Sequence, residues 1–244
     1  MTPKRTLATT RRVLRQLRHD RRSIGLILAV PCVFLGLLAW MFSDTPAVMD
    51  AFGPMALALF PALVMFLVTS VTTLRERTQG TLERLMTTQI GKGDFLLGYA
   101  LAFALMAALQ AIVLTAWAHW VCGVDVAGSL IALGGVAVLD AVLGSALGLA
   151  ASSLARTEFQ AVQMMPVMIV PQLLLCGVVM PRAQMPDVLE WLSGAAPLTY
   201  AVEATGDIAG GLGWDAAWPD LALMAAFTAL VLCLGVLTLR RRTR

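Results

Sequence analysis

A single carboxylic acid interrupts a long apolar stretch in the second half of the chain. Asp140 lies within residues 128–154, which otherwise hold only apolar, Gly and Ser residues. A charged side chain at the centre of a bilayer costs about 2.5–3.5 kcal/mol on insertion scales, so Asp140 must face protein or water. Gly144, Gly148 and Ser152 follow Asp140 at intervals of four residues and share its helix face, where small residues permit close helix packing. We therefore expect Asp140 to face a neighbouring helix.

A polar partner for Asp140 is available in the preceding apolar stretch. Gln110 lies at a similar depth, and we expect it to hydrogen-bond to Asp140 across the two spans. A proton or cation site at Asp140 is the functional alternative, although the spans offer no second acid or base near its depth for a proton relay.

A second group of side chains suits an apolar or amphiphilic ligand. Prolines in two further apolar stretches remove backbone donors and bend the helices, and Met is a flexible, polarisable contact for varied apolar molecules. These stretches predict walls of a substrate path, and a kinked packing helix is the alternative for the same residues. The candidate lining residues are Thr69, Thr73, Gln163, Met164, Met168 and Gln172.

Residues 75–94 form a charged connection that carries an apolar ridge. Gly80 begins a predicted short helix, on which Leu82, Leu85 and Met86 lie between charged residues. An apolar ridge flanked by Glu and Arg is suited to docking against another protein. The predicted docking residues are Glu76, Arg77, Gly80, Thr81, Leu82, Glu83, Arg84, Leu85 and Met86.

Motifs of common enzymes are absent from the sequence. It contains no G-x-x-x-x-G-K-[ST], no H-E-x-x-H and no G-x-S-x-G. The two histidines are far apart, and the four cysteines lack metal-ligand spacing. We expect no catalytic residues, no cofactor, no metal and no ATPase activity in this chain, and we expect no binding to nucleic acid.

The elements that position these residues follow from hydropathy. The chain is 59% hydrophobic and 14% charged, with a mean hydropathy of +0.80, so it is too apolar for a soluble domain. We predict an all-α polytopic membrane protein in which residues 24–244 form one six-span domain. The predicted spans are residues 24–43, 53–74, 95–121, 128–154, 160–180 and 218–239.

The charges between the spans alternate in sign. Seventeen of the 18 Lys and Arg residues fall on one side of the predicted spans, and only Arg182 falls on the other. The positive-inside rule then places both termini on the cytoplasmic side. We expect the membrane to be the bacterial cytoplasmic membrane. Residues 1–23 alternate Arg with apolar residues, which predicts an amphipathic helix on the lipid surface. Residues 181–217 predict an external hairpin of short re-entrant or interfacial helices, because Pro181, Pro186 and Pro197 break its apolar pieces.

Two motifs in these positions resemble one family of transporters. Glu76-Arg77-x-x-Gly80-Thr81-Leu82-Glu83-x-Leu85 is similar to the motif that follows the second span in permease subunits of type-2 ABC exporters, the drug and glycolipid export class. Gly177-x-x-x-Pro181, Met185-Pro186, Trp191 and Pro197-Leu198-Thr199-Tyr200-Ala201 resemble that family's signature near the fifth span and the external hairpin. With six spans and a basic N-terminal helix, the resemblance extends over nearly the whole chain.

The resemblance implies a complex of several subunits. Two permease copies, identical or different, would join two ABC ATPase subunits that hold ATP and Mg²⁺, and the docking helix would lie in a groove of the ATPase. Substrate would pass between the two permeases, along spans that include the second and fifth. The sequence leaves open an ion-coupled secondary transporter that uses Asp140, and a permease for polysaccharide or ion export.

Overall fold

The computed structural model describes residues 3–78 and 92–238, and all the secondary-structure elements among these residues are helices. Within these described residues, six helices are long and apolar enough to cross a membrane. They are α2 (Arg21–Met41), α3 (Pro46–Thr78), α5 (Lys92–Trp120), α6 (Leu130–Leu154), α7 (Glu158–Leu175) and α10 (Trp214–Thr238). The all-α class and the six predicted spans are therefore confirmed.

Two boundaries differ from the expected ones for reasons of backbone chemistry. α3 begins at Pro46 instead of residue 53, and Pro54, close to the expected start, lies inside the helix without ending it. α7 ends at Leu175 instead of residue 180, and Gly177 follows with a φ of +92°, a conformation in which an L-residue is strained.

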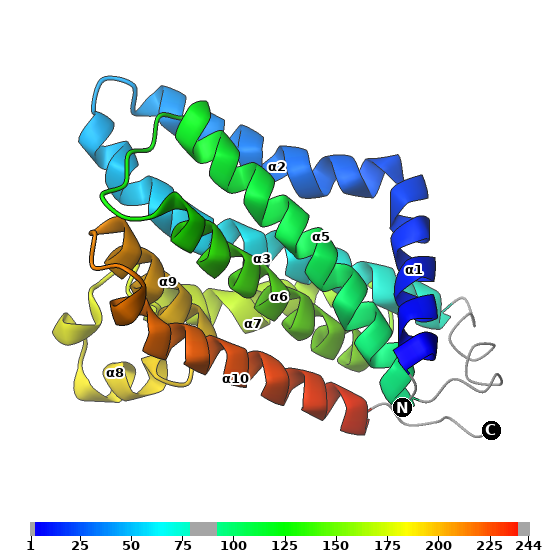
Figure 1. Ribbon diagram of the computed structural model, residues 1–244. Helices are drawn as coiled ribbons and strands as arrows, with labels where there is room; N and C mark the ends of the chain where they lie inside the picture. Colours follow the sequence, from blue (N-terminus) through cyan, green and yellow to red (C-terminus); the bar gives the residue numbers. More distant parts are fainter. Residues whose placement is uncertain (1–2, 79–91, 239–244) are drawn as a thin grey trace.

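The spans form a bundle with two chemically distinct ends (Figure 1). At one end, α1 (Pro3–His19) lies beside the last turns of α3 and the first turns of α5. We call this the basic end, because it carries the arginines of α1 together with Arg75, Arg77 and Arg156. The opposite, acidic end carries α8, α9 and the start of α10, and its acids are Asp44, Asp50, Asp125, Asp187, Glu190, Glu203, Asp207, Asp215 and Asp220.

Helix α1 runs at a steep angle to α2 and lies across the basic end (Figure 1). Its buried face is formed by Thr9, Thr10, Val13 and Leu17, and it packs mainly on α5. Arg11, Arg15 and Arg18 are exposed on the other faces. The expected helix in residues 1–23 is present, while its position on a lipid surface stays a prediction.

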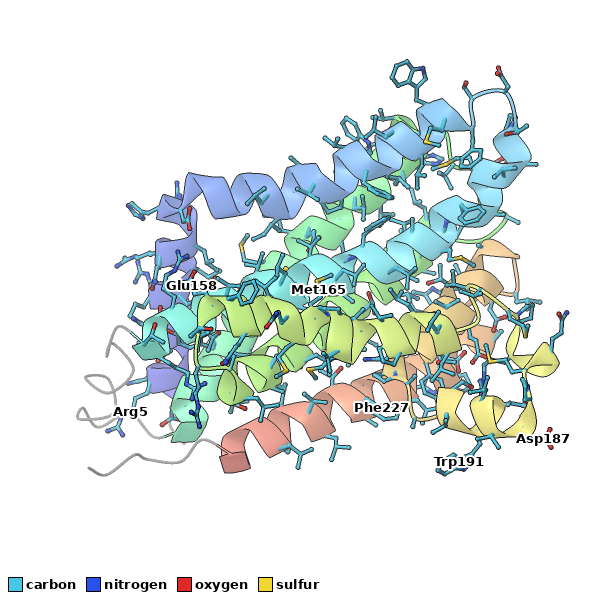
Figure 2. The ribbon with its side chains drawn as sticks, turned by 180° about the vertical axis from the view of Figure 1, so that it is seen from behind. Arg5, Glu158, Met165, Asp187, Trp191 and Phe227 are labelled. Atoms are coloured by element: carbon cyan, nitrogen blue, oxygen red, sulfur yellow. The ribbon has the colours of Figure 1, made fainter. Side chains whose placement is uncertain are left out.

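The expected hairpin region consists of short helices at the acidic end. They are η1 (Arg182–Gln184), α8 (Asp187–Ser193) and α9 (Pro197–Ala209). In Figure 2, Asp187 and Trp191 point away from the bundle at α8. α9 is largely buried against the spans, whereas Trp191 is exposed. How deeply this hairpin enters a membrane stays a prediction.

Helix α6 forms the centre of the bundle. In its most apolar stretch 61% of the residues are buried, against 11% in α7 and 22% in α2 and α10. α6 packs most extensively on α3 and also contacts α5 and α10. Asp140 is therefore held at the middle of the fold, whereas α7 is held by few contacts with its own chain.

Candidate functional site

The small residues of α6 lie directly against α3. A Cβ added at Gly144 would lie 2.3 Å from the backbone O of Ala62, and one at Gly148 would lie 2.5 Å from the O of Phe66. Both distances are too short for any side chain, so the two backbones meet where only glycine fits. The predicted close-packing face of α6 is confirmed, and the helix that it packs against is α3.

Asp140 begins this face and is fully buried. Its Oδ2 accepts a hydrogen bond of 3.1 Å from the backbone N–H of Ala62. Ala62 follows Pro61, whose ring removes a backbone donor and disturbs the preceding helical turn. In a membrane, side chains of neighbouring helices satisfy backbone groups at such a proline. The geometry thus gives Asp140 a structural role at the Pro61 turn of α3.

The expected hydrogen bond between Gln110 and Asp140 is not formed. Gln110 is buried in α5, and neither atom of its amide has a hydrogen-bond partner among the described residues. The Oδ1 of Asp140 likewise has no partner there. The expectation fails because the face of α6 that carries Asp140 packs against α3, where a backbone N–H is the donor.

The candidate substrate-path residues of α3 are placed inside the chain. Thr69 and Thr73 are 0% and 4% exposed, and a Cβ at Gly148 would lie 3.1 Å from the Cβ of Thr69. At least Thr69 therefore belongs to the packing of α3 on α6, and neither threonine reaches a surface that a second copy could cover. A role of these two threonines in a substrate path stays a prediction.

The candidate substrate-path residues of α7 are more accessible. Gln163 is exposed, and Met164 and Met168 are partly buried against the α3–α6 core. Both ends of the Gln172 amide form hydrogen bonds within the chain. Its Oε1 accepts from the N–H of Leu198 at 3.4 Å, and its Nε2 donates to the O of Met168 at 2.8 Å. Leu198 lies in the first turn of α9, where the preceding Ala196 provides no side-chain cap.

The end of α3 meets α1 and α5 at Glu76. This side chain is nearly fully buried, and its Oε2 lies 3.1 Å from a guanidinium nitrogen of Arg12 in α1. The same nitrogen of Arg12 donates to the hydroxyl of Tyr99 in α5 at 2.5 Å, and the guanidinium lies 5.8 Å from the Tyr99 ring centre. Thr10 adds a hydrogen bond of 3.1 Å to the O of Gly98. α1 therefore contacts chain on both sides of residues 79–91.

The two arginines beside Glu76 contact two other helices. Arg77 donates to the backbone O of Ser152 in the last turn of α6, where a cation is favourable because helix C-termini carry partial negative charge. Arg75 makes a bidentate pair with Glu158 at the start of α7, at 3.0 and 3.1 Å. Three consecutive residues thus link the end of α3 to α1, α6 and α7.

Most predicted docking residues lie outside the part of the chain that the structure describes. Glu76 and Arg77 are described above, whereas Gly80, Thr81, Leu82, Glu83, Arg84, Leu85 and Met86 fall in residues 79–91. Their role in docking stays a prediction.

Sequence reasoning missed an ion pair at the acidic end. Arg182 is the isolated cation there, and its guanidinium donates to both carboxylate oxygens of Glu203 at 2.8 and 3.0 Å and to the hydroxyl of Ser193 at 2.7 Å. The hydrogen bonds to Glu203 raise the pKa of Arg182 above its usual value, so the guanidinium stays charged. A lone cation among many acids was a signal that such a pair would form. Elsewhere in residues 3–78 and 92–238, no group of three or more His, Cys, Asp or Glu side chains is arranged to hold a metal.

Comparison with known proteins identifies a family with this architecture. The family described as ABC-2 type transporter matches residues 4–208. The Escherichia coli K12 protein named "Probable multidrug ABC transporter permease YbhR" is 29% identical over 177 residues, which cover 70% of this chain and 48% of that protein. "ABC transporter G family member 20" of Dictyostelium discoideum is 25% identical over 180 residues, covering 72% of this chain and 25% of its own length. A further E. coli protein, "Probable multidrug ABC transporter permease YbhS", is 25% identical over 150 residues, 61% of this chain and 40% of that protein.

Proposed function

Because the chain belongs to the ABC-2 type transporter family, we propose that it is the membrane-spanning permease subunit of an ATP-driven ABC exporter. The observation that carries the proposal is the match over residues 4–208, which includes α1, α3, α5 and their contacts at the basic end. The chain spans about half the length of YbhR, so the activity of the complete relative is carried over here as part of the proposal.

The proposed orientation places the basic end in the bacterial cytoplasm. Lys and Arg are retained on the cytoplasmic side of short loops, and the described arginines other than Arg182 lie at or near this end. Both termini are then cytoplasmic, and α8 and α9 face the exterior.

A separate ATPase subunit supplies the energy in this proposal, since the sequence lacks a phosphate-binding motif of its own. ATP and Mg²⁺ bind to that subunit, which docks on residues 75–94. Glu83→Arg reverses a charge in the predicted docking segment, so we expect the companion ATPase to dissociate while the permease stays inserted. Normal association and normal export would contradict this docking surface.

A second permease copy completes the proposed complex. Phe159, Val167 and Leu174 of α7 are 71%, 66% and 57% exposed on the single chain. The outer location of α7 is visible in Figure 2, where Met165 marks its middle. A helix that buries so little within its own chain is suited to a contact with another copy, with lipid filling the remaining surface.

The proposed substrate is a lipophilic or amphiphilic molecule such as a drug or lipid. Gln163, Met164 and Met168 lie on accessible or partly accessible faces of α7 and offer polarisable and hydrogen-bonding contacts. The relatives YbhR and YbhS carry the word "multidrug" in their names, which favours the same class. A polysaccharide or an ion is the alternative cargo of such a permease.

The test begins with the native membrane. The tagged chain is purified in mild detergent, companions are identified, and the complex is placed in sealed vesicles with a lipophilic cationic dye. We expect an ATPase to co-purify and dye transport to require ATP hydrolysis, with no transport when the ATPase variant binds but cannot hydrolyse ATP. Transport driven by a proton gradient without nucleotide, and lost in Asp140→Asn, would instead support the ion-coupled alternative.

A further inference from the structure

Helix α7 is tied to the rest of the chain by few contacts at the basic end. Its most apolar stretch is only 11% buried, and in the described part of the chain the small apolar cluster that includes its first turn has Leu74, Ala155 and Ala161 as buried members. Figure 2 shows Glu158 at the tip of α7, beside the end of α3. The bidentate pair with Arg75 is therefore a large part of what positions this end of α7.

Glu158 is the first residue of α7, and side-chain hydrogen bonds hold this start of the helix. Thr157 accepts a hydrogen bond of 3.2 Å from the N–H of Gln160, and the side chain of Gln160 accepts one of 2.9 Å from the N–H of Arg156. This arrangement resembles a capping box, except that Gln160 accepts from the residue before the N-cap, and it holds the first turn of the helix. A force applied to Glu158 therefore acts on the whole first turn of α7.

The end of α3 that carries Arg75 is also held by neighbouring helices. Its neighbours Glu76 and Arg77 bind α1 and the last turn of α6, and residues 79–91 follow directly. In the proposed complex the ATPase docks on residues 75–94, which include this end of α3, so its movement acts directly on the turn that carries Arg75.

We propose that Arg75 and Glu158 are positioning residues that make α7 follow the end of α3. This inference rests on the proposed function, in which an ATPase moves the loop after α3. Through this pair, the movement reaches the helix that faces the second copy. The two side chains are 52% and 50% exposed, so the pair couples the two helices modestly.

The experiment measures the position of α7 in the complete permease–ATPase complex in nanodiscs. The four native cysteines are replaced by alanine, nitroxide labels are attached at Val167 of α7 and Leu105 of α5, and distances are measured with and without ATP. Both labelled positions are exposed on the single chain, so the labels do not disturb the packing within it.

The compared variants are Arg75→Glu, Glu158→Arg and the double exchange, with Arg156→Glu as the matched control in the same region. We expect ATP to shift the wild-type distance, and each single variant to reduce the shifted population by about 1.5- to fivefold, the range for an exposed ion pair. The double exchange restores the shift, and the control leaves it unchanged.

Two sets of results separate this inference from the proposed function. An undiminished shift in Arg75→Glu, no restoration in the double exchange, or no shift in a wild-type complex that hydrolyses ATP overturns the role of the pair alone. A wild-type chain that neither binds an ATPase nor supports hydrolysis overturns the proposed function, and this is measured on the same preparation.

Discussion

The hydrogen bond between Asp140 and the N–H of Ala62 can be tested by separating the acceptor atom from the negative charge. Asp140→Asn keeps a side-chain oxygen that can accept from Ala62, whereas Asp140→Leu removes the acceptor and leaves a buried N–H beside Pro61. An unsatisfied buried backbone group costs about 1–3 kcal/mol. We therefore expect the Leu variant to be less stable by about this amount and the Asn variant to stay within about 1 kcal/mol of wild type.

Packing adds to the cost of the Leu variant. Asp140 is 0% exposed and lies one turn before Gly144, where the α6 backbone already touches Ala62. A branched side chain at this position has little room, and overpacking costs typically about 1–3 kcal/mol. The two effects act in the same direction, so the Leu variant should lose about 2–6 kcal/mol in total.

The assay is thermal unfolding of the purified permease in detergent, monitored as the fraction of protein that stays monodisperse. ATP-dependent transport is measured on the same variants. The expected order of stability is wild type and Asn together, then Leu. A stable Leu variant would refute the acceptor role. An Asn variant that is stable but inactive would show that the carboxyl group acts in transport, which the structural interpretation does not allow.

Three further substitutions test neighbouring features of the bundle. Gly144→Ala places a Cβ 2.3 Å from the backbone O of Ala62, so it should lower the thermal midpoint by separating α3 from α6, whereas Gly206→Ala, which meets nothing within 4 Å, should not. Gln110→Met removes two buried amide atoms that have no partner among the described residues, so stability should be unchanged or higher by about 1 kcal/mol; a clear loss in thermal unfolding would reveal an unseen polar partner. Arg12→Ala leaves the buried carboxylate of Glu76 without its cation, so we expect a loss of about 3 kcal/mol, which limited proteolysis after α1 would detect and which Arg12→Ala combined with Glu76→Gln should partly reverse.

Much of the fold could be predicted because the bilayer imposes simple rules on sequence. A span needs about 20 apolar residues, so hydropathy alone located six helices and the basic residues alone grouped their ends. Helical periodicity also predicted that Asp140, Gly144, Gly148 and Ser152 share one face. These properties depend on residues close together in the chain, and the structure agrees with them.

The partners of that face depended on tertiary structure. Periodicity states which residues share a face of α6, but the helix opposite is chosen by packing among segments distant in sequence. The glycines of α6 pack against the backbone of α3, so Asp140 accepts a hydrogen bond from Ala62. The amide of Gln110 in α5 has no hydrogen-bond partner among the described residues. The same packing buried Thr69, which composition alone had placed on a substrate path.

The sequence by itself determined that this is a membrane protein with six helical spans and a strong asymmetry of charge, because both follow from local composition. Only the tertiary structure decided that Arg75, Glu76 and Arg77 contact three different helices. Consecutive residues point about 100° apart around a helix, so each could reach a different neighbour, but the identity of those neighbours is set by how the bundle closes.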